Sequence, residues 1–159
     1  MIRKIFPVIL CLFLLAGCNS ESLSGNQWLL QQTTVYEDLE QASNNICDLF
    51  SLHLIGAVKE SDFKNEVRLL ITLLKSSQTN YREGQKEIAP GSHSYASKCG
   101  LEALDNAYQV TLGLLEISDN HTGDPEMLAQ EYLSWREIFI TEIAAFLTAK
   151  NLIMESEMR

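Results

Sequence analysis

Apolar side chains recur at alternating steps of four and three residues over most of the chain beyond residue 27, which is the spacing of one face of an α-helix. In the first such stretch the spacing is kept by Val35, Leu39, Ala42, Ile46 and Leu49. No stretch alternates apolar and polar residues at every second position, as a half-buried strand does. We therefore expect an all-α fold, a four-helix bundle with polar connections. Its helices are predicted over residues 28–58, 61–80, 95–118 and 125–154.

Residues typical of helix ends separate these stretches. Ser61 is a good N-cap for the second helix, and Pro125 suits the first turn of the fourth. Pro90 stops any helix that reaches it. The polar residues 76–80 have low helix propensity, whereas Tyr81 beyond them continues the apolar spacing. The pattern alone therefore leaves the end of the second helix open.

The N-terminal residues form a separate pattern. Two cations, Arg3 and Lys4, precede an apolar run over residues 5–14, and small residues follow it. A basic start, a short apolar run and small residues at a cleavage site are the features of a secretory signal peptide. The apolar run is shorter than the roughly 20 residues that a membrane-spanning helix needs.

Leu15, Ala16, Gly17 and Cys18 at the end of this pattern resemble the signal of bacterial lipoproteins. The resemblance implies cleavage before Cys18 and attachment of a diacylglycerol thioether to its sulfur. It divides the chain into a signal peptide (1–17), a lipidated flexible tether (18–27) and a single helical domain (28–159). In enterobacterial lipoproteins an Asp after the lipidated Cys retains the protein at the inner membrane. Asn19 in that position predicts a lipid-anchored protein of the outer membrane instead.

Two cysteines lie inside the predicted domain. An exported domain resides in a compartment that favours oxidation, so Cys47 and Cys99 are predicted to form a disulfide with each other. The alternative is a pair of buried thiols that pack as small apolar groups. The two residues lack the Cys-x-x-Cys spacing of zinc sites.

This disulfide conflicts with a second helix that extends to residue 88. In an up-down-up-down bundle with such a helix, the two sulfurs lie roughly 18 Å apart along the bundle axis at 1.5 Å per residue. A disulfide needs Cα atoms within about 7 Å of each other. The pairing therefore predicts that the second helix ends near Asn80 and that residues 81–94 form a long connection back along the bundle.

The charge balance is strongly acidic. The formal net charge is -9, and removal of residues 1–17, which hold Arg3 and Lys4 and no acid, lowers it to -11. Such a charge opposes binding to nucleic acid and direct docking on anionic lipid head groups. It suits either simple solubility or a basic protein partner.

The side chains that most often carry chemistry lack the spacing of known sites. His53, His93 and His121 have no ligand partner at helical spacing, and His53 is expected to be a helix-end histidine on an apolar stripe. Asp119, His121 and Asp124 share a loop without the EF-hand pattern. No Gly-x-Ser-x-Gly and no glycine-rich phosphate loop occurs. The sequence therefore predicts no enzymatic activity, no metal and no cofactor.

Two further features bear on binding. Glu142 falls on the apolar stripe of the fourth helix and is expected either to mark the edge of that stripe or to pair with a cation such as Lys150 or Arg136. The second helix carries apolar residues on several sides, which suits a groove for a partner helix.

A lipidated helical domain of this size with two cysteines resembles the pilotins, lipoproteins that escort secretin subunits to the outer membrane. The resemblance implies an accessory factor for an envelope secretion or pilus system, which faces the periplasm and binds a protein partner there. The alternative is an immunity, exclusion or inhibitor lipoprotein that neutralises a basic protein, which the acidic charge favours.

Overall fold

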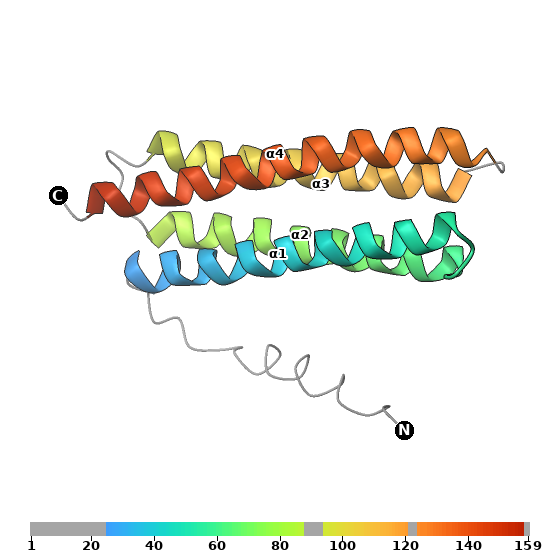
Figure 1. Cartoon of the computed structure of the whole chain (residues 1–159). Helices are drawn as coiled ribbons and strands as arrows, with labels where there is room; N and C mark the ends of the chain where they lie inside the picture. Colours follow the sequence, from blue (N-terminus) through green and yellow to red (C-terminus); the bar gives the residue numbers. More distant parts are fainter. Residues whose placement is uncertain (1–24, 88–93, 121–123, 158–159) are drawn as a thin grey trace, which may run out of the picture.

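The computed structural model describes residues 25–87, 94–120 and 124–157, and all four of its elements are helices. They are α1 (Gly25–Leu54), α2 (Glu60–Glu87), α3 (Ser94–Asn120) and α4 (Pro125–Glu157). Figure 1 shows them running up and down in two layers, α1 beside α2 and α3 beside α4. The start of α1 and the end of α4 lie at the same end of the bundle. The predicted all-α four-helix bundle is confirmed.

Each helix contacts its two neighbours around the bundle, and the contact between α3 and α4 is the most extensive. The contact between α1 and α4 is the least extensive of the four. Within the described ranges the diagonal pairs, α1 with α3 and α2 with α4, make no comparable contact. The α1–α4 seam is therefore the most open side of the bundle.

The first helix ends at Leu54, four residues before the predicted end at Val58, because a glycine turns the chain. Gly56 has a φ of 72°, a left-handed conformation that costs glycine little. Its amide donates to the carbonyl of His53 and the next amide, of Ala57, donates to the carbonyl of Leu52, both at 2.9 Å. These are the two hydrogen bonds of a Schellman C-cap, which satisfies carbonyls that the helix leaves free.

The predicted start of the fourth helix agrees with the structure. Oδ1 of Asp124 accepts hydrogen bonds from the amides of Glu126 at 3.0 Å and Met127 at 3.4 Å. An N-cap of this kind satisfies amide groups that the first turn of a helix leaves without intrahelical partners.

The prediction that the second helix ends near Asn80 is wrong, because α2 continues to Glu87. The hydroxyl of Ser77 donates to the carbonyl of Leu73 and that of Thr79 to the carbonyl of Lys75, so these side chains are satisfied within the helix. Nε2 of Gln78 reaches the carbonyl of Leu104 on α3 at 3.4 Å. Tertiary packing therefore overrides the weak helix propensity of this stretch. The predicted connection 81–94 is wrong over residues 81–87, and residues 88–93 lie outside the described residues.

The core is aromatic along much of its length. Phe50 stacks on Tyr132 with ring centroids 3.8 Å apart, and Trp135 lies 5.2 Å from Phe139. The buried indole Nε1 of Trp135 donates to the buried hydroxyl of Thr111 at 3.1 Å. Burying rings of this size contributes a few kcal/mol each and holds the two layers together.

Candidate binding site between α1 and α4

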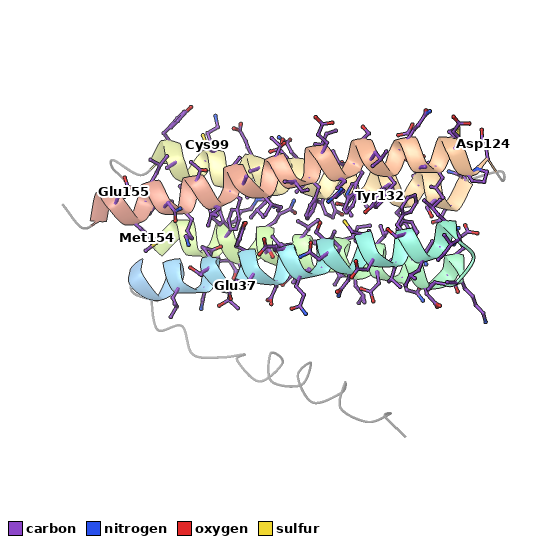
Figure 2. The ribbon with its side chains drawn as sticks, in the orientation of Figure 1. Glu37, Cys99, Asp124, Tyr132, Met154 and Glu155 are labelled. Atoms are coloured by element: carbon purple, nitrogen blue, oxygen red, sulfur yellow. The ribbon has the colours of Figure 1, made fainter. Side chains whose placement is uncertain are left out.

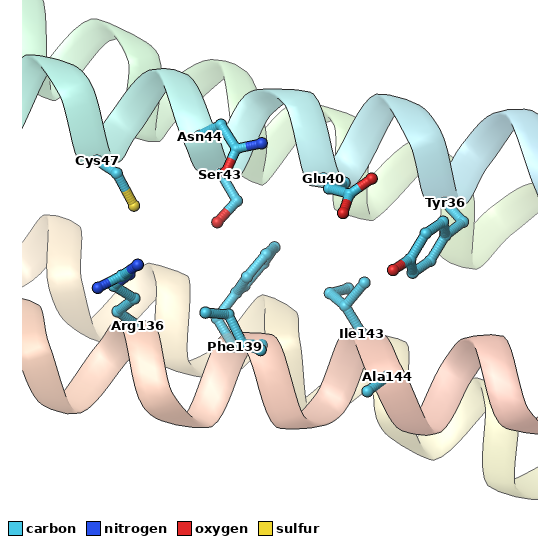
Figure 3. A pocket seen from close by; sticks show the side chains of 10 residues that line it. Tyr36, Glu40, Ser43, Asn44, Cys47, Arg136, Phe139, Ile143 and Ala144 are labelled. Carbon is cyan, nitrogen blue, oxygen red and sulfur yellow. The ribbon is translucent and has the colours of Figure 1, made fainter.

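A groove opens along the α1–α4 seam, with a cavity volume of about 180 Å³. Figure 3 shows side chains from α1 facing side chains from α4 across it. Its lining residues, five from each helix, are Tyr36, Glu40, Ser43, Asn44, Cys47, Arg136, Phe139, Ile140, Ile143 and Ala144.

Close contacts shut the seam at both ends of this groove. Beyond Cys47, the rings of Phe50 and Tyr132 stack and fill the space between the helices. Beyond Tyr36, the ammonium of Lys150 donates to the hydroxyl of Thr33 at 3.1 Å. Lys150 is only 7% exposed, so its aliphatic part packs in the seam. The groove is thus a bounded gap in an otherwise closed interface.

Two small side chains help to keep the seam open. Ser43 of α1 lies opposite Phe139, Ala144 of α4 lies nearer Tyr36, and each fills little of the space between the two helices. The buried side chains of Phe139 and Ile143 lie below them and form an apolar floor. The side chains between two packed helices set the distance between the helix axes. The larger side chains at both ends of the groove hold α1 and α4 apart, so the small residues between them leave a gap.

The polar groups of the groove stand on its walls. Glu40, Asn44 and Tyr36 come from α1, and Arg136 comes from α4. Glu40 and Asn44 are exposed, as is Arg136. A cavity of about 180 Å³ lies below the roughly 300–1,000 Å³ of pockets that enclose small organic ligands. The groove therefore has room for a few inserted side chains.

The structure does not form the predicted Cys47–Cys99 disulfide, because both residues are free thiols. Cys47 lies near the end of α1, where the chain turns into α2, and Cys99 lies near the start of α3. An α2 of 28 residues separates these two ends, so the sulfurs lie roughly 25 Å apart along the axis at 1.5 Å per residue. Figure 2 shows Cys99 far along the bundle from Tyr132, the neighbour of Cys47. The unbroken helix thus excludes the pairing.

Cys47 instead contributes to the environment of Tyr132. Burial raises the pKa of the Tyr132 phenol, and the neighbouring thiol of Cys47 raises it further. The Tyr132 phenol is therefore neutral at this end of the groove at ordinary pH. Cys99 is half-buried at the opposite end of the bundle and packs near Tyr95 and Tyr81.

The other sequence-predicted residues have structural roles where the structure describes them. Nδ1 of His53 lies 3.4 Å from the carbonyl of Val58, and its ring is parallel to that of Phe63, as expected of a helix-end histidine. Asp119 pairs with Lys64 and with Arg68, each at 3.3 Å. His93 and His121 lie outside the described residues.

Glu142 is half-buried on α4, as expected at the edge of the stripe, and its carboxylate contacts α3 rather than Lys150 or Arg136. Its Oε1 accepts a hydrogen bond from Nδ2 of Asn106 on α3 at 3.2 Å, whereas Lys150 and Arg136 lie toward α1. Glu142 therefore ties α4 to α3 on the side of the helix away from the groove.

Across the described ranges, no group of three or more His, Cys, Asp or Glu side chains is placed to hold a metal ion. Among the helices of the same ranges, none combines the length and apolar character needed to cross a membrane. Comparison with known protein families, with characterised proteins and with solved structures yields no match.

The groove lies between α1 and α4 and not on the second helix, where the sequence predicts one. One signal pointed to the fourth helix: Leu133, Ile138 and Ile140 are apolar residues on sides of α4 that face solvent. A helix with apolar residues around its whole circumference is usually buried on more than one side, by the rest of the protein or by a partner.

Proposed function

We propose that this protein is a lipid-anchored, non-enzymatic binding protein of the bacterial envelope. The observation that carries the proposal is the sequence Leu15-Ala16-Gly17-Cys18, followed by a helical domain whose first helix begins at Gly25. Six residues, 19–24, would separate the lipidated cysteine from the bundle. Even fully extended they span only about 20 Å, so the domain would work close to the membrane surface. Asn19 favours the outer membrane.

The first role that fits such a protein is that of a pilotin-like assembly factor for an envelope secretion or pilus system. The support is architectural: a small helical bundle on a lipid tether, with a groove sized for inserted side chains. Identification of the partner by cross-linking in cells tests this role.

The second role is that of an immunity, exclusion or inhibitor lipoprotein that neutralises a basic protein. The favouring observation is that α1 carries four acids and no Lys or Arg. The α4 helix carries six acids against two cations, whereas α2 is balanced with five of each. A surface of one sign speeds association with a partner of the opposite sign.

Replacement of the anchor tests the proposal common to both roles. We expect Cys18→Ser to move the protein from the membrane fraction to the soluble fraction, because the residue would no longer accept the lipid. The thermal unfolding midpoint of the released domain should be unchanged, since Cys18 lies before α1. Fractionation with immunoblotting and circular dichroism measure the two effects.

Ser20→Ala in the same tether is the matched control and should leave the protein in the membrane fraction. Intact mass shows whether residues 1–17 have been removed, because an uncleaved signal peptide would itself hold the variant at the membrane. If Cys18→Ser stays in the membrane fraction without residues 1–17, the protein is not held by a lipid on this residue. If the released domain is unfolded, the anchor and the bundle are not independent.

Salt dependence separates the two roles once a partner has been cross-linked in cells and identified. Binding through apolar anchors, as expected of an assembly factor, should change little with added salt. Binding of a basic protein through unpaired acids should weaken steeply as the Debye length falls from about 10 Å at 0.1 M towards 3 Å at 1 M salt.

A further inference from the structure

We infer that the α1–α4 groove is the docking surface for a basic amphipathic helix of a partner protein. The apolar side chains of that helix would enter the groove, and its cations would meet the acids of α1. The inference rests on the proposed binding function, and it assigns that function a surface and a partner chemistry.

The length of the groove fits a helix. Its α1 wall runs from Tyr36 to Cys47, a span of about 16 Å at 1.5 Å per residue. Three turns of a partner helix cover this length, with apolar anchors at i, i+3 or i+4 and i+7. The floor they would contact is formed by the buried side chains of Phe139 and Ile143.

Apolar surface continues beside the groove on α4. Ile140, which lines the groove, is 51% exposed, and Leu133 is 58% exposed. Residues seven apart lie on the same side of a helix, so these two side chains form a ridge along the α4 wall. Exposed apolar residues that line up beside a groove mark an interaction surface more often than isolated ones do.

The charges along α1 decide which partner suits the groove. Glu40 lines the groove, and Glu37 and Asp48 are exposed on the adjoining side of α1. The fourth acid, Asp38, lies on the other side of the helix, and α1 has no Lys or Arg. In the described part of the chain, the salt bridges join Lys64, Arg68 and Arg82 to acids of α2 and α3. The acids of α1 are thus left for cations from outside.

Arg136 is the one cation in the groove lining and stands opposite Cys47, so the partner's C-terminal helix end, with its negative dipole, suits that end.

The same charges argue against other occupants. In a dimer formed through this groove, the acids of α1 and α4 in one copy would lie against those of the other copy and repel them. An anionic lipid surface would be repelled likewise. The volume of about 180 Å³ is small for an organic ligand.

A designed peptide tests the inference with defined chemistry. The probe is an amphipathic helix of about 18 residues made of Leu and Lys, with Leu at i, i+3, i+4 and i+7. Its affinity for the full chain carrying Cys18→Ser is measured by titration calorimetry. We expect binding by the Lys peptide and none by the same peptide with Glu in place of Lys.

Paired variants of the protein locate the site. Ala144→Trp, which fills the groove from an exposed helix position, and Glu40→Lys, which reverses a wall charge, should each weaken binding at least about tenfold. Their matched controls are Leu69→Trp on α2 and Glu116→Lys on α3, both at exposed positions away from the groove. The controls should change the affinity by no more than about twofold.

Three outcomes would overturn the inference: no binding of the Lys peptide, equal losses in the groove variants and their controls, or a dimer in sedimentation that Ile140→Lys dissociates. A photo-crosslinker in cells separates this failure from failure of the proposed function. A protein captured from Leu69 and not from Asn44 would keep the binding function and reject this surface. Capture from Asn44 through a basic amphipathic helix would support both.

Discussion

Tyr81→Ala is expected to lower the free energy of unfolding by about 3–5 kcal/mol, the usual cost of truncating a buried aromatic residue. Tyr81 has no exposed surface, and its ring packs edge-on against Phe146 of α4 at a centroid distance of 5.8 Å. Burial also raises the pKa of its hydroxyl to about 12, which agrees with a ring held away from water. Urea unfolding followed by circular dichroism measures the loss.

Tyr95→Ala is the matched control, since Tyr95 is 77% exposed at the start of α3. It should change the free energy of unfolding by no more than about 0.5 kcal/mol. A similar small loss in Tyr81→Ala would mean that α2 does not pack against α4 and α3 beyond Asn80.

Gly100→Ala and Gly113→Ala are expected to have opposite effects although both glycines lie in α3. A Cβ at Gly100 would collide with the hydroxyl of Tyr81 and lie 3.3 Å from Cβ of Ala149. The buried Tyr81 ring has no room to move away, so we expect a loss of about 1–3 kcal/mol. A Cβ at Gly113 meets nothing within 4 Å, so Gly113→Ala should gain about 0.5–1 kcal/mol from helix propensity.

A double-mutant cycle connects the Gly100 prediction to its cause. Tyr81→Phe removes the hydroxyl oxygen that the new Cβ would strike, so Gly100→Ala should cost much less in that background. Equal costs in both backgrounds would show that the close approach of α3 to Tyr81 is not what requires a glycine.

The helices could be predicted from the sequence because apolar residues at steps of three and four record which side of each helix is buried. The N-cap of α4 was predictable for a related reason, since Asp124 and Pro125 act within one turn of each other. Both the apolar spacing and the N-cap arise between residues that are close in the chain, so both leave a pattern in the sequence.

The end of α2 was mispredicted because two indications conflicted. Ser77 and Tyr81 continue the apolar stripe of the helix, and both are buried in the structure. The expected disulfide between Cys47 and Cys99 requires a second helix that ends near Asn80, whereas this stripe indicates a longer one. The polar residues at 76–80 then looked like a helix end, although Ser77 and Thr79 are hydrogen-bonded to α2 itself and Gln78 to Leu104.

The groove could not be predicted, because it depends on which helices are neighbours. Ser43 and Ala144 lie 101 residues apart, and neither is unusual on its own helix. Only the pairing of α1 with α4 places these small side chains in the same groove. The excess of acids on α1 was present in the sequence, but the total charge of the chain hid that this helix carries four acids and no Lys or Arg.

The distance between Cys47 and Cys99 tests the arrangement of the bundle most directly, because it depends on an unbroken α2 and on the placement of α1 against α4. Spin labels on these two residues, with Cys11 and Cys18 replaced by Ser, allow the distance to be measured by pulsed electron paramagnetic resonance. We expect two labelled thiols separated by roughly 25–30 Å. A disulfide between them, which needs Cα atoms within about 7 Å, would contradict this arrangement.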